Sequence, residues 1–414
     1  MGISTPAPPT TFTVPYARMG SQLDEREVGI VREVMASGQT LSQGLWRDRF
    51  EEKFRHHVGT RHAYSVTSGT VALELAIHLL DLEPGDEVIT TPQTYQATIQ
   101  PLLNYDVTVR FADVLPASLN IDPDRVAELI TPRTKAIVLV HYAGLPAQMD
   151  EIMALADRHG ILVLEDAAHA LGTVYRSRPA GQLGHIATFS FHSSKNITTL
   201  GEGGMITFDR DDWADRLERL RGNESDAVFV ASDQTFGPFS QPPAGVLYPG
   251  RAYTHECTEF RRAGTNATLS EPAAAVGLVQ LDKLPELVAR RQAIAARLTE
   301  VLTRFDGIRV PEVPADVVHP YHLFTFLVEP ESGIERDALL RRLGEEGVET
   351  YLRYFPLHLL PEWRAQGHGY GECPVAERLW FEQHMNLPCH PSLSMTQTEH
   401  LADALTRALT ALSR

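Results

Sequence analysis

Lysine is rare in this sequence, and one of its four copies stands in a setting suited to covalent chemistry. The four are Lys53, Lys135, Lys195 and Lys283. Lys195 follows an apolar stretch and lies among serines and a glycine-rich turn at 201–204, so a bulky ligand could lie against the backbone there. An amine in such a place can form an imine with an aldehyde. The other three have ordinary helical or strand-entry surroundings, and we expect them to be solvated charges.

Two further polar segments could bind a phosphate and a protonated ring. Gly69 and Thr70 begin an apolar helix predicted over residues 71–80, where unpaired N–H groups and the helix dipole attract anions. The alternative is that this segment is an ordinary helix cap. Asp166 ends a buried apolar run, so its carboxylate needs a donor such as the protonated nitrogen of a pyridine ring. The alternative for Asp166 is a cap on a following helix.

An aromatic residue completes this set of candidates. Tyr95 follows another apolar run and could stack on a flat ring, although a lone tyrosine is more often part of a core. The histidines lack metal-ligand spacing, and we predict no metal site. An anion cup, a ring partner, a stacking aromatic and an imine-forming lysine are together what one cofactor, pyridoxal 5′-phosphate, requires.

These segments follow short apolar runs that alternate with helical stretches. Such alternation predicts an α/β domain with a mostly parallel sheet, and ligands at the carboxyl ends of its strands. The predicted strands are residues 63–66, 87–89, 107–111, 136–140, 161–164, 186–191 and 205–208. The predicted helices are residues 22–57 with a break at 37–38, 71–80, 149–158, 269–305, 336–346 and about 396–412, with a late strand at 323–328.

Length and charge restrict the remaining possibilities. The 414 residues exceed what one core usually serves, so we expect a large domain at 1–285 and a smaller one at 286–414, with a long loop at 223–265. A net charge of −16 argues against a nucleic-acid partner. No apolar run is long enough for a membrane helix and no signal peptide is visible, which favours a cytoplasmic protein. Three scattered cysteines support neither a disulfide framework nor a zinc site.

Five motifs occur in order along the chain: Ser-Gly-Thr-Val-Ala-Leu at 68–73, Pro-Gly-Asp-Glu-Val-Ile at 84–89, Glu-Asp-Ala-Ala-His-Ala-Leu-Gly at 165–172, Ser-Phe-His-Ser-Ser-Lys-Asn at 190–196 and Gly-Glu-Gly-Gly at 201–204. With these motifs the chain resembles the DegT/DnrJ/EryC1/StrS aminotransferase family over about residues 23–412. The resemblance implies fold type I of the pyridoxal-phosphate enzymes, with a large domain whose mostly parallel sheet is flanked by helices and a smaller C-terminal α+β domain. It also implies a homodimer with shared active sites and amino transfer to a keto sugar or related cyclic ketone.

The resemblance also assigns roles to individual residues. Lys195 would be the catalytic residue that carries the cofactor as a Schiff base, and Asp166 would pair with the pyridinium nitrogen. Tyr95 would stack on the ring and His169 would lie near its phenolic oxygen. The phosphate would be held by Gly69, Thr70 and Ser190, with Asn266 of the partner subunit. The residues assigned to the substrate side are Arg353, Tyr354, His358 and His322.

Two departures from the family pattern concern the substrate. Thr265 and Thr268 replace a usual tyrosine and arginine, and Arg353 replaces the histidine of Ile-His-Tyr. We expect glutamate or glutamine as donor and a keto sugar, preferably nucleotide-linked, as acceptor. The alternatives are a free cyclitol or C7 cyclic ketone, a dehydratase or aromatising aminobenzoate-type synthase on the same fold, and a regulatory protein that retains the cofactor fold. The sugar dehydratases generally replace the lysine with histidine, so Lys195 argues against them.

Overall fold

The structure, a computed structural model, describes residues 11–16, 19–222, 227–229, 258–260 and 264–413. Most of the loop predicted at 223–265 and Cys257 lie outside the described residues. The chain divides into two compact units, one formed by Met1–Asp209 with Leu269–Arg414 and the other by Arg210–Thr268. The second unit contains α6 (Asp211–Arg221) and an antiparallel pair, β10 (Ala227–Phe229) and β11 (Thr258–Phe260).

A seven-stranded sheet forms the centre of the first unit, in the order β1-β9-β8-β5-β4-β2-β3. The strands β3, β2, β4, β5 and β8 are parallel, and β9 is antiparallel to both of its neighbours. This confirms the predicted α/β fold with a mostly parallel sheet. The strands are β1 (His62–Val66), β2 (Glu87–Thr90), β3 (Thr108–Phe111), β4 (Thr134–Val140), β5 (Leu162–Asp166), β8 (Ile186–Ser190) and β9 (Gly204–Phe208).

Helices cover this sheet, and local sequence explains where they begin and end. Asp24 forms a capping box at the start of α1, and Gly59, with φ of 86°, ends α2 in the left-handed region that favours glycine. α3 is apolar on nearly every side because it packs against β8 and β9. The helices are α1 (Glu25–Ala36), α2 (Leu45–Val58), α3 (Gly69–Leu79), α4 (Pro123–Leu129) and α5 (Met149–His159), with short 3-10 helices η1 (Gln96–Thr98), η2 (Gln100–Asn104) and η3 (Tyr142–Gly144).

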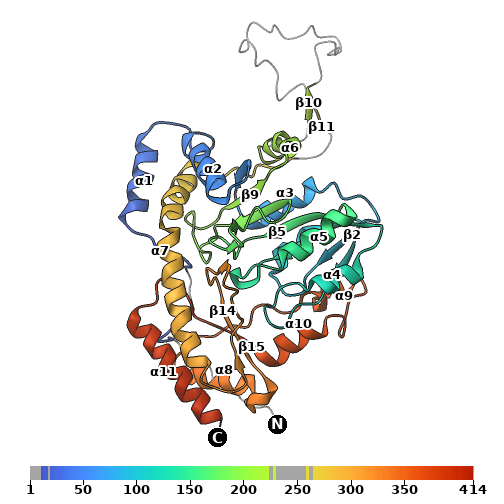
Figure 1. Cartoon of the computed structure of the whole chain (residues 1–414). Coiled ribbons are helices and arrows are strands. Elements are labelled where there is room, and N and C mark those ends of the chain that lie inside the picture. Colours follow the sequence, from blue (N-terminus) through green and yellow to red (C-terminus); the bar gives the residue numbers. More distant parts are fainter. Residues whose placement is uncertain (1–10, 17–18, 223–226, 230–257, 261–263, 414) are drawn as a thin grey trace, which may run out of the picture. The chain divides into compact units, whose positions relative to one another are not determined.

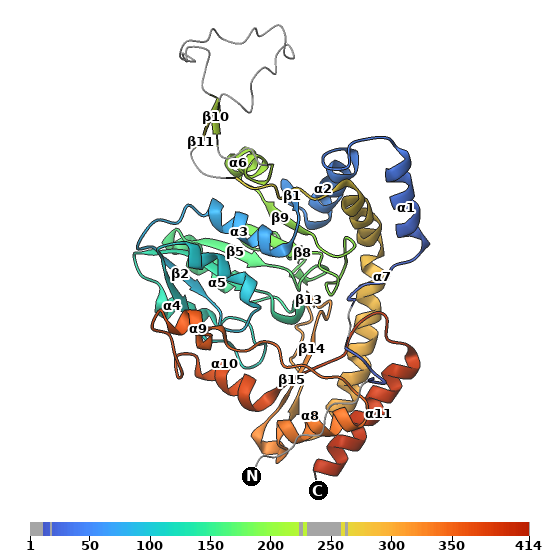
Figure 2. The same cartoon turned by 180° about the vertical axis from the view of Figure 1, so that it is seen from behind.

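The long helix α7 (Glu271–Leu302) belongs to two apolar cores. Figures 1 and 2 show it beside α1 and α2 at one end and beside α11 at the other. Its first half, with Leu281 and Leu284, packs into the core of the large sheet, and its second half, with Ile294 and Leu298, packs into a smaller core. Pro285 is inside this helix, and Leu287 and Val288 after it still pack into the core of the large sheet. The division at residue 285 stays a prediction.

The smaller core is built around a three-stranded antiparallel sheet in the order β12-β14-β15. Its elements are β12 (Ile308–Arg309), β14 (Phe324–Val328), β15 (His384–Leu387), α8 (Arg336–Glu345) and α11 (Met395–Leu412). The remaining elements are β6 (Val174–Tyr175), β7 (Arg178–Pro179), β13 (Val317–Val318), η4 (Pro330–Ser332), η5 (Leu357–Leu359), α9 (Pro361–Arg364), α10 (Pro374–Arg378) and η6 (Leu379–Gln383).

One prediction about the lysines is wrong. Lys283 is not a solvated charge, because its residue is only 3% exposed and its amine lies 2.6 Å from Glu27 and 2.9 Å from Asp24. The packing of α1 on α7 buries this ion pair. Lys53, by contrast, keeps a partly exposed side chain and pairs with Asp282 at 2.5 Å.

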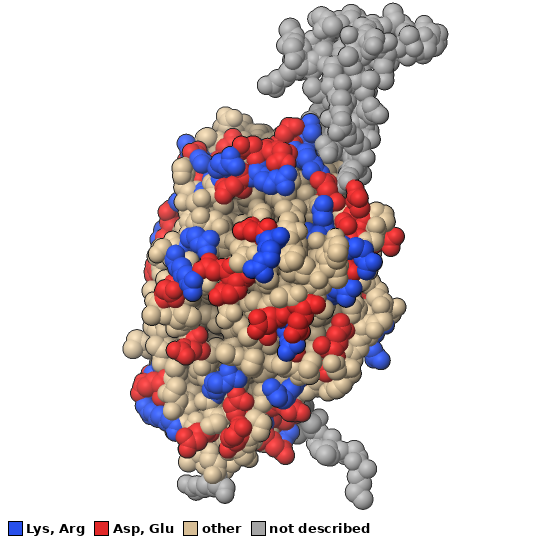
Figure 3. All heavy atoms as spheres, turned by 45° about the vertical axis from the view of Figure 1, so that its right-hand side comes forward, with Lys and Arg blue, Asp and Glu red and all other residues tan. Residues whose placement is uncertain are grey.

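The surface carries mixed charge. On the face shown in Figure 3, acidic and basic side chains of the described residues are interspersed. Within the described ranges, no helix is both long and apolar enough to cross a bilayer.

Candidate active site

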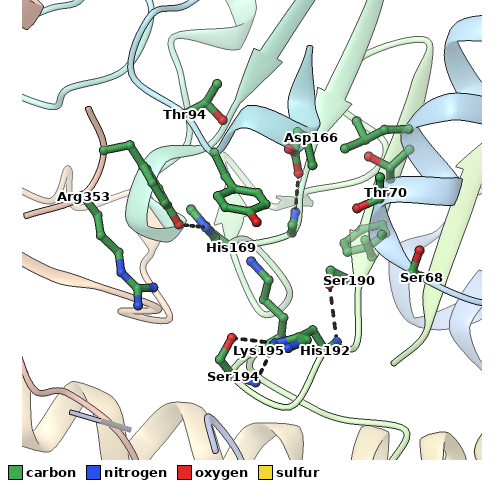
Figure 4. Close-up of a pocket in the computed structure, with 18 of the residues that line it drawn as sticks. Ser68, Thr70, Thr94, Asp166, His169, Ser190, His192, Ser194, Lys195 and Arg353 are labelled. Carbon is green, nitrogen blue, oxygen red and sulfur yellow. Dashed lines mark hydrogen bonds between the residues drawn. The ribbon is translucent and has the colours of Figure 1, made fainter. Parts of the chain in front are cut away.

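A cavity of about 570 Å³ opens at the carboxyl ends of β1, β5 and β8. This is where ligands bind in sheets of this kind. Its wall also includes the start of α3, the loop after β8 and the segment 351–354 (Figure 4). The predicted site residues that line the cavity are Gly69, Thr70, Tyr95, Asp166, His169, Ser190, Lys195, Arg353 and Tyr354.

The start of α3 faces the end of β8 across one side of the cavity. The Ser68 hydroxyl accepts a hydrogen bond from Val71 N at 3.2 Å, so Ser68 is the helix cap. Gly69 and Thr70 are the first helical residues, and N–H groups at this position have no partner within the helix. A Cβ atom at Gly69 would lie 2.6 Å from Cβ of Ser190, so only glycine fits here without a shift. Ser68 therefore caps α3, and the N–H groups of its first residues can still bind an anion.

Asp166 is fixed by donors on both of its oxygens. It is 4% exposed; Oδ1 accepts from Ala168 N at 3.0 Å and Oδ2 accepts from Thr98 Oγ1 at 2.7 Å. The residues that follow form turns, so Asp166 caps no helix, contrary to the alternative interpretation. These two donors orient the carboxylate in the cavity wall, where it can accept a hydrogen bond from a proton-bearing ring nitrogen.

A second threonine extends this chain of hydrogen bonds to the cavity wall. Thr94 Oγ1 lies 2.6 Å from Thr98 Oγ1, and both residues are fully buried. Because the single hydroxyl proton of Thr98 is given to Asp166, Thr94 must be the donor to Thr98. Neither residue was predicted from the sequence, although both lie within four residues of Tyr95 in the segment that follows β2.

His169 is a buried ring with one unpartnered nitrogen. Its Nε2 lies 3.1 Å from the Tyr354 hydroxyl, and its Nδ1 has no hydrogen-bond partner within the described part of the chain. Burial lowers the pKa of His169 well below its usual value, with further lowering by Lys195 and Arg353. The ring is therefore neutral at physiological pH, and Nδ1 is a buried polar atom that a ligand could satisfy.

Lys195 extends from the loop after β8 into the cavity, as Figure 4 shows. Burial of the amine lowers the pKa of Lys195 to about 8, although the charge of Asp166 opposes the shift. The loop is packed against the N-terminal segment: Gly20 N donates to Ser193 O at 2.8 Å, and a Cβ atom at Gly20 would lie 2.1 Å from Ser194 O. Gly20 is a third residue, after Thr94 and Thr98, that was not predicted from the sequence to support the site.

Two aromatic side chains stand at the mouth of the cavity. Tyr95 is 51% exposed, so it is not a core residue, and its ring lies 5.9 Å from that of Tyr354. Such a half-exposed ring is free to stack on a ligand.

Three predicted residues do not line the cavity. His322 lies behind His169, with ring centroids 4.3 Å apart. His358 is fully buried and its Nε2 lies 2.8 Å from Glu377, so the structure gives it an internal partner instead of the predicted substrate contact. Asn266 belongs to the second unit, and its role in a partner subunit stays a prediction.

The cavity fits pyridoxal phosphate in chemical type. A glycine-lined helix start suits a phosphate, a buried carboxylate suits a protonated ring nitrogen, and an unpartnered His169 Nδ1 suits a polar ring substituent. A lysine with a lowered pKa supplies the amine.

Comparisons with known proteins agree with the family resemblance found in the sequence. The model of the DegT/DnrJ/EryC1/StrS aminotransferase family matches residues 21–406. The chain is 34% identical over 386 residues to the spore coat polysaccharide biosynthesis protein SpsC of Bacillus subtilis strain 168, covering 92% of this chain and 94% of that one. The crystal structure of the aminotransferase TlmJ from Streptoalloteichus hindustanus superposes with a TM-score of 0.83 at 32% identity, covering 97% of this chain and all of that one.

A more distant structure shares the fold. Spr1654 of Streptococcus pneumoniae, solved in its pyridoxal-phosphate form, is 24% identical with a TM-score of 0.82 and covers 96% of this chain and 99% of that one. The match over nearly the whole length confirms the predicted enzyme class and cofactor: this chain belongs to the DegT/DnrJ/EryC1/StrS aminotransferase family and is a pyridoxal-phosphate-dependent aminotransferase.

Proposed function

We propose that this enzyme transfers the amino group of glutamate or glutamine to a keto sugar, with a nucleotide-linked sugar as the preferred acceptor. The observation that carries the proposal is the amine of Lys195, whose pKa is lowered to about 8 inside a cavity that also holds Asp166 and the start of α3. The sugar class is supported by similarity to SpsC, a protein of polysaccharide biosynthesis. We also propose a homodimer with shared active sites. In it, Asn266 of the partner subunit contributes to the phosphate cup, which is formed by Gly69, Thr70 and Ser190.

Different residues of the cavity wall would bind different parts of the cofactor. Gly69, Thr70 and Ser190 would hold its phosphate, Asp166 would hold the proton on its ring nitrogen, and Tyr95 would lie against its ring. When bound, the cofactor supplies an electron-withdrawing ring that weakens the C–H bond next to the transferred amino group.

Lys195 acts as the general base and acid. With a pKa near 8, its amine is neutral often enough at physiological pH to accept a proton at Nζ, and its conjugate acid is strong enough to return that proton. Asp166 is held in place by donation from Thr98 and from the Ala168 N–H, one to each of its oxygens. Neutral His169 contributes a hydrogen bond without adding positive charge.

Hydride trapping tests the lysine. Borohydride reduction of the holoprotein should fix the cofactor covalently to the peptide that contains Lys195. Lys195→Arg should abolish both trapping and amino transfer, whereas Lys53→Arg, at a surface ion pair, should change neither. Label on a different peptide, or normal turnover by the Lys195→Arg enzyme, would refute the assignment.

A panel of acceptors tests the substrate. The pyridoxamine form of the protein should return to the aldehyde spectrum when mixed with nucleotide-linked keto sugars. A return with free cyclitol ketones alone would refute the sugar assignment while leaving the enzyme class intact.

A further inference from the structure

The cavity contains a guanidinium group without a carboxylate partner. Arg353 lines the cavity, and its nearest charged or ionisable neighbours within the described residues are the tyrosines 354, 16 and 351. No ion pair to Arg353 forms within the described part of the chain, whereas other buried cations there, such as Lys283 and Arg221, each pair with a carboxylate. A partly buried positive charge with no anion beside it is a candidate for binding one.

The side chain of Arg353 is held from two sides. Its guanidinium carbon lies 5.2 Å from the ring centre of Tyr16 and 5.1 Å from that of Tyr351. The two rings themselves meet edge to face at 4.6 Å. Cation–π contacts of this kind fix a guanidinium without using its N–H donors. Arg353 also has a side-chain hydrogen bond to Tyr354, but a guanidinium has five N–H donors, so others stay available to a ligand.

The backbone at Arg353 is equally well fixed. Its N–H donates to Asn386 Oδ1 at 2.8 Å, and its carbonyl accepts from Gln93 Nε2 at 3.1 Å and from the Tyr142 hydroxyl. Three side chains from three different segments thus hold one residue. Such fixation lowers the entropy that a bound ligand would have to offset.

The position of Arg353 separates it from the phosphate cup. Figure 4 shows Arg353 on one side of the cavity and Ser68, Thr70 and Ser190 on the other, with Lys195 and His169 between them. The cofactor's phosphate would occupy the far side. Arg353 therefore faces the space left for the reacting substrates.

We propose, on the basis of the function proposed above, that Arg353 is the substrate-anion site of this enzyme. It binds an oxyanion, which is either a carboxylate of the amino donor or a phosphate of a nucleotide-linked acceptor. A guanidinium can grip either group with two parallel N–H···O hydrogen bonds.

Equilibrium binding to the holoenzyme tests this site without turnover. Glutarate carries the two carboxylates of glutamate but no amino group, and uridine and thymidine diphosphate carry the diphosphate of a nucleotide-linked sugar. Dissociation constants for each would be measured by calorimetry with the wild type, Arg353→Met and Arg353→Lys. Arg364→Met is the matched control, because Arg364 is exposed on α9, outside the cavity wall.

Loss of a charge-assisted hydrogen-bonded pair should weaken binding of the anion by about 10- to 100-fold in Arg353→Met, with Arg353→Lys in between. Weakening for glutarate alone assigns the site to the donor, and weakening for the diphosphates alone assigns it to the acceptor. Unchanged binding in Arg353→Met, or no binding of any probe to the wild type, overturns the proposal. Hydride trapping at Lys195 should persist in every Arg353 variant, and its loss from the wild type would refute the underlying function instead.

Discussion

Thr98→Val removes the hydroxyl that donates to Asp166 while keeping the shape of the side chain. In the native chain that bond is 2.7 Å long and joins two buried residues. The variant leaves Oδ2 of Asp166 without this donor and leaves the Thr94 hydroxyl without its acceptor at 2.6 Å. Both losses fall on buried polar groups, where a missing hydrogen bond costs more than at the surface.

The size of the effect follows from these contacts. A hydrogen bond to a charged group contributes about 1.5–3 kcal/mol, and part of that loss should appear where Asp166 meets the cofactor. Asp166 keeps the Ala168 N–H, so the carboxylate is weakened as a partner and is not abolished. We expect the dissociation constant for pyridoxal phosphate to rise about 10- to 100-fold, since about 1.4 kcal/mol corresponds to a factor of ten.

The assay is a titration of apoprotein with pyridoxal phosphate, followed by absorbance. Thr98→Ser, which restores a hydroxyl, should recover most of the affinity. Thr90→Val is the matched control: it deletes another fully buried threonine bond, from Thr90 on β2 to Val138 O on β4 at 2.8 Å, and β2 is two strands from the β5 strand of Asp166. It should lower the free energy of unfolding similarly but leave cofactor affinity unchanged. Native affinity in Thr98→Val, or equal damage in Thr98→Val and Thr98→Ser, would show that the threonine chain does not position Asp166.

Three further predictions concern other contacts. Lys283→Met should lower the free energy of unfolding in urea by about 3–5 kcal/mol, because Glu27 would keep a buried charge without its partner; a loss below 1 kcal/mol would contradict this. Gly69→Ala should weaken pyridoxal phosphate binding, because the new Cβ would lie 2.6 Å from Cβ of Ser190. Its control is Gly29→Ala on α1, where the added Cβ would meet open space. That variant should bind the cofactor normally, and its free energy of unfolding should rise by about 0.5–1 kcal/mol. In the apoprotein, acetylation of Lys195 by acetic anhydride should accelerate as pH rises and level off above about 8, because the neutral amine is the nucleophile; mass spectrometry showing a rate that still climbs at pH 10 would argue against a lowered pKa.

The sheet was predictable from the sequence because its strands are buried on both faces. Residues 161–164 were predicted as a strand from a continuous apolar run, and β5 occupies Leu162–Asp166. The same reasoning predicted that Asp166 and Ser190 lie at strand ends, and both residues line the cavity. The local sequence pattern was sufficient to predict a residue's position wherever a single helix or strand determines that position.

Contacts between distant segments were not predictable in this way. The burial of Lys283 depends on Glu27, which lies 256 residues away, and no local pattern on α7 reveals it. The family resemblance assigned His358 to the substrate side, and its hydrogen bond to Glu377, 19 residues further along the chain, could not be predicted from the sequence around η5. Tyr16 could not be connected with Arg353 at all, because an extended N-terminal segment has no periodicity to interpret.

The order of strands in the large sheet has a consequence for synthesis on the ribosome. β1 is hydrogen-bonded to β9 alone in this sheet, so the nascent chain cannot begin to pair β1 before residue 204 has left the exit tunnel. The start of α3 follows β1 closely in the chain and faces Ser190. The opposite wall of the cavity cannot form until residues 351–354 have been synthesised. Closing contacts over such separations is slow. Vitamin B6 should therefore be captured only after translation is nearly finished, and a stalled chain that ends before residue 204 should not retain it.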